Sequence, residues 1–145
     1  MQIQRIQSVY LFLATILMVI FIFLPVIGLI NDNGLSAMGA VTVGTIQHAM
    51  PLLLCLDALV AILLFITIFK YRNLSLQMKL CKVNILLIIS LLAYIFITAY
   101  MQKGESIAVI QWSIALPFVA IVLTMLALKG IKHDKKLLSD SERIR

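Results

Sequence analysis

The sequence predicts an all-α integral membrane protein in which four transmembrane helices pack up-down-up-down into one bundle. The first observation is composition: of 145 residues, 63% are hydrophobic and 12% are charged, whereas soluble domains average about 45–50% and about 25%. The second is a set of four continuous apolar runs, 19 to 22 residues long. Each run is long enough to be a transmembrane helix, because a helix needs about 20 residues to cross a ~30 Å bilayer core. Soluble, disordered and disulfide-stapled folds are therefore excluded. A barrel is excluded too, since its strands are about 10 residues of alternating polarity.

The first apolar run, residues 9–30, is expected to be a retained transmembrane helix. Its 22 residues exceed the roughly 7–15 of a cleavable signal peptide. Pro25 lies near its outer end and is expected to kink or finish the helix. The segment that follows, residues 31–48, is rich in Asn and Gly. Within it the Val-Thr-Val sequence at residues 41–43, flanked by glycines, predicts a short strand or hairpin over the bundle.

The other three runs, residues 49–69, 83–101 and 107–128, complete the bundle. The connections between them are short, which requires neighbouring helices to be antiparallel. Pro51 suits the first turn of the second helix, where no N–H donor is needed, and Pro117 is expected to bend the fourth helix in its middle. No coiled-coil heptad stands out among the apolar residues.

The character of the chain changes after Leu128. Lys129 and Gly130 predict the end of the fourth helix, and the residues beyond them are densely charged. The expected organisation is therefore a membrane domain, residues 1–128, followed by a basic cytoplasmic tail, residues 129–145.

The distribution of charge predicts the orientation of the spans. Eleven of the twelve Lys and Arg residues lie before the first run, between the second and third, or after the fourth, and Lys103 alone lies on the other side. Short loops that remain in the cytoplasm carry the excess of positive charge. Both ends of the chain are therefore expected to be cytoplasmic.

Asp57 is the one charged residue inside the four runs, and an ionisable residue within a membrane span is a functional hypothesis by default. It could relay protons or bind a cation in a small transporter or channel subunit. The alternative is a protonated carboxyl group, hydrogen-bonded across the bundle at the depth of Tyr94 and the Ser113 carbonyl. No run contains a second acid or base to which Asp57 could pass a proton. The structural role is therefore favoured.

The sequence shows no recognisable set of catalytic residues. Cys55 is expected in the outer half of the second helix, roughly 22 Å of helix from Lys70 at its inner end. Cys81 begins the third helix on the inner side, which is too far from Cys55 for a disulfide. The sequence contains no metal-ligand set, no Ser–His pair and no phosphate loop, so neither an enzyme nor a cofactor is expected. Asn84 and the hydroxyl residues of the last two runs (Ser90, Thr98 and Thr124) are expected to bond between helices.

Three segments resemble a small bacterial family of four-span membrane proteins known only as a domain of unknown function. They are residues 4–11, residues 68–86 and residues 127–145, in which Asp134-x-Lys136-Leu137 precedes Glu142-Arg143-Ile144-Arg145. The resemblance spans the whole chain, is most specific in the tail, and implies a bacterial inner membrane, but no activity. It directs attention to cytoplasmic residues rather than to Asp57.

The expected function is that of a non-enzymatic accessory or scaffold protein. Its basic face would dock a protein partner or anionic lipid, which attracts each Lys or Arg near the surface by ~1 kcal/mol. Nucleic acid is not expected, because orientation alone accounts for the basic residues, and the oligomeric state is open. The residues expected at the docking surface are Arg72, Gln77, Lys79, Lys82, Asp134, Lys136, Arg143 and Arg145.

Overall fold

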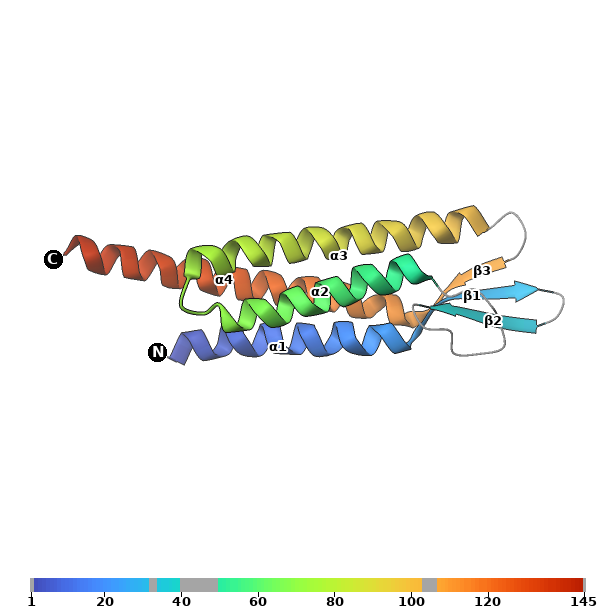
Figure 1. The fold of residues 1–145 in the computed structure, drawn as a ribbon, viewed down its shortest axis with the longest axis horizontal. Helices are drawn as coiled ribbons and strands as arrows, with labels where there is room; N and C mark the ends of the chain where they lie inside the picture. The colour runs from blue at the N-terminus through green and yellow to red at the C-terminus, as the bar shows by residue number, and fades with distance from the viewer. Residues whose placement is uncertain (1, 32–33, 40–49, 103–106, 145) are drawn as a thin grey trace.

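The computed structural model describes residues 2–31, 34–39, 50–102 and 107–144. Four long helices lie side by side and alternate in direction, with a small sheet at one end (Figure 1). Each is long and apolar enough to cross a membrane, which confirms the four-helix prediction. The helices are α1 (Gln2–Phe23), α2 (Pro51–Phe69), α3 (Leu74–Gln102) and α4 (Ala115–Arg143).

Two helix boundaries lie several residues inside the predicted runs, and α3 starts nine residues before its run, at Leu74. The first helix ends at Phe23, and Pro25, which has no N–H to donate, opens a strand instead. The fourth helix starts only at Ala115, after a short 3₁₀ helix, η1 (Trp112–Ile114). Pro117 therefore lies in the first turn of α4, where a missing donor costs little. The predicted mid-helix bend at Pro117 is wrong for this reason.

The apolar residues next to these boundaries form a three-stranded antiparallel sheet. Its order is β2-β1-β3, with β1 (Pro25–Asn31) in the centre between β2 (Gly34–Gly39) and β3 (Ile107–Ile110). The Gln111 N–H donates to the Val26 carbonyl at 3.0 Å, and the Ser113 hydroxyl donates to the Pro25 carbonyl. These bonds join the sheet to the start of α4. The strand predicted at residues 41–43 lies outside the described residues.

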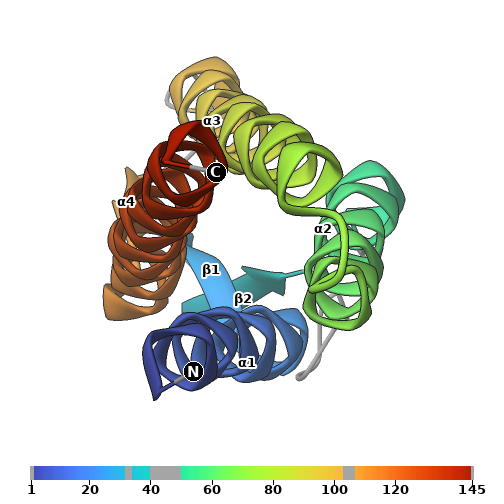
Figure 2. The ribbon, with the colours of Figure 1, turned by 90° about the vertical axis from the view of Figure 1, so that its left-hand side faces the viewer.

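The bundle closes as a ring in which each helix contacts two neighbours: α1 and α3 both pack against α2 and α4 (Figure 2). The buried positions of every helix recur at alternating intervals of three and four residues, the 3.5-residue period of left-handed coiled coils. We call this line of positions the seam. Its members are Gln7, Leu11, Ala14, Met18 and Phe21 on α1; Leu53, Asp57, Val60, Leu64 and Thr67 on α2; Gln77, Cys81, Asn84, Ile88, Leu91 and Ile95 on α3; and Pro117, Ala120, Thr124, Ala127, Ile131 and Asp134 on α4.

The sequence analysis missed this heptad because the outward positions are as apolar as the seam. Leu86 on α3 is 67% exposed, and Ile62 and Val122 are exposed on α2 and α4. A soluble coiled coil would carry charged residues at such positions. Apolar side chains facing outward are what a helix bundle surrounded by lipid requires.

The fourth helix continues without a break through Lys129 and Gly130 to Arg143. The predicted helix end at these residues is therefore wrong. Glycine is common just after helix ends because it adopts the left-handed conformation without strain. Here Gly130 lies inside the helix, where the absence of a side chain leaves room for a residue of α1.

Candidate functional site at the basic end of the bundle

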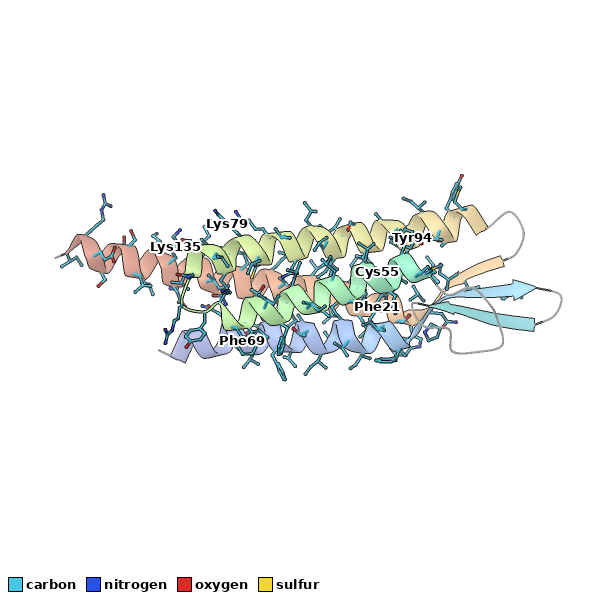
Figure 3. The ribbon with its side chains drawn as sticks, in the orientation of Figure 1. Phe21, Cys55, Phe69, Lys79, Tyr94 and Lys135 are labelled. Atoms are coloured by element: carbon cyan, nitrogen blue, oxygen red, sulfur yellow. The ribbon has the colours of Figure 1, made fainter. Side chains whose placement is uncertain are left out.

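The end of the bundle opposite the sheet collects most of the basic residues; we call it the basic end. It contains the start of α1, the end of α4 and the connection between α2 and α3 (Figure 1). Lys79 on α3 and Lys135 on α4 are both found there (Figure 3). Nine basic side chains of this end are exposed: Lys70, Arg72, Lys79, Lys82, Lys129, Lys132, Lys135, Lys136 and Arg143.

Most of the predicted docking residues lie on this exposed surface, and two do not. Gln77 is 2% exposed and Asp134 is 8% exposed, so both belong to the packing between helices rather than to a docking surface. Arg145 lies outside the described residues. The exposed members of the predicted set are Arg72, Lys79, Lys82, Lys136 and Arg143.

Asp134 is bonded to the first helix. The side-chain Nε2 of Gln7 donates a hydrogen bond to Asp134 Oδ2 at 2.6 Å, and both side chains are buried. Gly130 lies one helical turn before Asp134, and a Cβ atom there would be 2.9 Å from Gln7 Cγ. The missing side chain of Gly130 thus makes room for Gln7. We call these three residues the clasp, because they hold the end of α4 against the start of α1.

A second buried polar group joins α2 to α3 near the same end. Asn84 Nδ2 donates to Thr67 Oγ1, and Gln77 Nε2 donates to the Thr67 backbone carbonyl, both at 3.4 Å. The Thr67 hydroxyl in turn donates to the Leu63 carbonyl at 2.6 Å. The predicted interhelical role of Asn84 is confirmed. That of Ser90, Thr98 and Thr124 is wrong, because each donates to a carbonyl of its own helix, at Leu87, Tyr94 and Ala120.

Asp57 is fully buried on the seam of α2, between Leu53 and Val60. Neither carboxyl oxygen has a hydrogen-bond partner among the described residues. The predicted bond across the bundle to Tyr94 or to the Ser113 carbonyl is therefore not formed. Tyr94 is half-buried on α3 (Figure 3).

The two cysteines are both free. Cys55 is exposed on α2, and Cys81 is buried on the seam of α3. Among the described residues, no three His, Cys, Asp or Glu side chains group as metal ligands would. The described buried polar side chains of the basic end are three amides, one hydroxyl and one carboxyl, which are suited to hydrogen bonding.

Gln7 was missed by the sequence analysis because it precedes the first apolar run. A signal was present, however. Gln7 precedes Leu11 by four residues and Ala14 by seven, so it continues the buried line of α1 toward the basic end. Its partners Gly130 and Asp134 were assigned to a separate tail, which hid the pairing.

Four helices of spanning length and hydropathy, an outward-facing apolar surface and basic residues gathered at one end are features of a membrane protein. Within that class, the chain belongs to the family described as domain of unknown function DUF4293, whose model matches residues 3–144. No curated protein matches it in sequence.

Proposed function

We propose that this protein is a non-enzymatic accessory or scaffold protein of the bacterial inner membrane that binds anionic lipid or a protein partner through its basic end. The observation that supports this proposal is the clasp. Gln7 holds Asp134 against the bundle, and beyond this bond α4 continues as a helix to Arg143 instead of forming a loose tail. We call residues 132–143 the arm.

The length of α4 supports a projecting arm. Its 29 residues span about 43 Å at ~1.5 Å per residue, whereas the hydrocarbon core is ~30 Å thick. About 13 Å of helix therefore extends into the headgroup layer and the water beyond. Lys132, Lys135, Lys136 and Arg143 are exposed on this part.

The connection between α2 and α3 adds charge at the same end. Lys70 and Arg72 are exposed there, and Lys79 and Lys82 are exposed on the first turns of α3. Each basic residue near an anionic surface contributes ~1 kcal/mol of attraction. The positive-inside rule places the basic end in the cytoplasm. Its charge then faces the cytoplasmic leaflet, which contains anionic lipid, and any cytoplasmic protein partner.

Charge neutralisation on the arm tests the proposal without disturbing the clasp. The variant combines Lys132→Gln, Lys135→Gln, Lys136→Gln and Arg143→Gln and keeps Asp134. The matched control removes acidic charge from the same helix, with Asp140→Asn and Glu142→Gln. Each protein is extracted in mild detergent, and mass spectrometry measures the retained lipid and the co-purifying proteins.

The basic-to-neutral variant is expected to lose bound anionic lipid, or a specific co-purifying protein, while the control keeps both. Loss of lipid alone identifies the bilayer as the partner, and loss of one protein identifies a complex. If the variant and the wild type retain the same lipids and the same proteins, the proposal is wrong.

A further inference from the structure

Two hydrogen-bond acceptors inside the bundle have no partner among the described residues. They are the Asp57 carboxyl on α2 and Oδ1 of Asn84 on the neighbouring helix α3. The large majority of buried side-chain polar atoms in proteins are bonded to protein or to ordered water. Two such exceptions on adjacent helices of one bundle therefore call for a common explanation.

Among the described residues, the helices around Asp57 place no cation at its depth that could neutralise a carboxylate. Its own helix places Leu53 and Val60 on either side of it along the seam. The helices that pack against α2 are α1 and α3, and residues 6–23 and 83–101 of these contain no Lys, Arg or His. Across the bundle, residues 112–128 of α4 contain none either.

The titratable side chains in the same parts of the neighbouring helices are tyrosines. Tyr10 on α1 and Tyr94 on α3 are half-buried, and Tyr100 at the far end of α3 is exposed. Cys81 is buried on α3, near the basic end. None of these groups carries a positive charge. An ionised carboxyl without a partner is strongly disfavoured in such surroundings, whereas the protonated acid is tolerated.

The register of α2 and α3 places Asn84, whose Oδ1 has no partner among the described residues, between the depth of Asp57 and the basic end. The bond between Asn84 and Thr67 sets these residues side by side. Asp57 lies ten residues before Thr67 on α2, about 15 Å at ~1.5 Å per residue. Buried water satisfies such acceptors elsewhere in proteins, and a water route along this interval passes the seam residues Val60 and Leu64. Beyond Asn84, Gln77 continues the polar line toward the basic end.

We propose that Asp57 is a proton-binding site within the bundle, occupied by a proton at rest, which exchanges that proton with the basic end through water that passes Asn84. In the exchange the O–H bond of the acid breaks, the proton goes to a water molecule, and a carboxylate remains until a proton returns. The ligand is the proton itself, and no redox partner is involved. This inference does not depend on the docking function proposed above.

Infrared spectroscopy of the full chain in lipid membranes tests the site. Wild type is compared with Asp57→Asn, which keeps the size of the side chain and cannot titrate. Near neutral pH, the wild type is expected to show the C=O band of a protonated carboxylic acid, which the variant lacks. Asp140→Asn, on the exposed arm, is the matched control and should keep the band. A wild type without this band overturns the proposal.

Transfer to D2O tests the exchange, because deuteration shifts the C=O band of an accessible acid. We expect the shift in wild type and a rate at least tenfold slower in Asn84→Leu, in which the route is closed by an apolar side chain. A band that does not shift overturns the exchange, and an unchanged rate in Asn84→Leu overturns the route.

A further readout needs no variant and therefore survives a folding defect in Asp57→Asn. Hydrophobic carbodiimides react with protonated acids in apolar surroundings: the acid proton moves to a carbodiimide nitrogen, and the carboxyl oxygen bonds to the central carbon. Peptide mass spectrometry of wild-type membranes should find the adduct at Asp57. Modification confined to Asp32, Asp134 or Asp140 would contradict the proposal.

Discussion

The side-chain amide of Gln7 donates a hydrogen bond of 2.6 Å to the Asp134 carboxyl, although the two residues are 127 positions apart. This bond fixes the start of the first helix to the end of the fourth. Its location beyond the apolar core means that the last turns of α4 are held by polar contact as well as by packing of Ile131. The basic arm therefore has a fixed starting point on the bundle.

Breaking the clasp should destabilise the bundle. Gln7→Leu leaves the Asp134 carboxyl without its donor, and Asp134→Leu leaves the Gln7 amide without its acceptor. Each change is expected to lower the free energy of unfolding by about 1–3 kcal/mol. Thermal unfolding in detergent, read by circular dichroism, measures the loss. The double variant should lose clearly less than the sum of the single losses, as bonded pairs do. Additive losses would show that the two residues act independently.

Gly130→Ala should also destabilise the protein, against the usual trend for helices. Replacing glycine by alanine inside a helix ordinarily raises the free energy of unfolding by as much as about 1 kcal/mol. Here its Cβ would lie 2.9 Å from Gln7 Cγ, so Gln7 must move away from Asp134. The expected net loss is about 1–3 kcal/mol in the same unfolding measurement. Ser141→Ala, exposed on the same helix, is the control and should change stability by less than about 0.5 kcal/mol. A stabilised Gly130→Ala variant would refute the close contact.

Thr67→Val should weaken the junction of α2 and α3. The change keeps the shape of the side chain but removes the acceptor of Asn84, leaving a buried amide without that partner. A loss of about 1–2 kcal/mol is expected. Ser90→Ala is the matched control, because Ser90 is exposed and bonds within its own helix. Equal effects of the two changes would show that the interhelical bond contributes nothing.

The two ends of the bundle should lie on opposite sides of the membrane. Reporter fusions after Arg145 and within the segment at Gly34 test this, since one set of reporters is active only in the cytoplasm and another only outside it. The positive-inside rule predicts a cytoplasmic reporter at Arg145 and an external one at Gly34. Fusions that report the same side would overturn the orientation.

The sequence by itself determined the number of helices and the approximate position of each, because the hydrophobic thickness of a bilayer imposes a length that composition reveals. It also located the basic end, since charged residues interrupt the apolar runs at defined points. The structural role favoured for Asp57 implied a buried side chain, and Asp57 is fully buried. The number of helices and the location of the basic end depend on local composition, which can be read without knowing which segments of the chain contact one another.

The helix ends were harder to locate. Residues 27–30 and 107–110 belong to the predicted apolar runs, yet they pair with each other as strands. Whether such residues become helix or strand depends on a partner about eighty positions away. Hydropathy shows that these residues are apolar but does not distinguish a helix from a strand.

The interior face and the clasp were decided by the tertiary structure alone. In a soluble bundle the polar residues mark the outside, but here lipid makes both faces apolar, so the seam cannot be recognised from apolar spacing. Asp134 and Gln77 looked like surface residues because their segments are rich in charge, and only packing against α1 and α2 shows them to be buried. The sequence states which residues can enter a membrane, whereas contact between helices far apart in the chain decides which of them face one another.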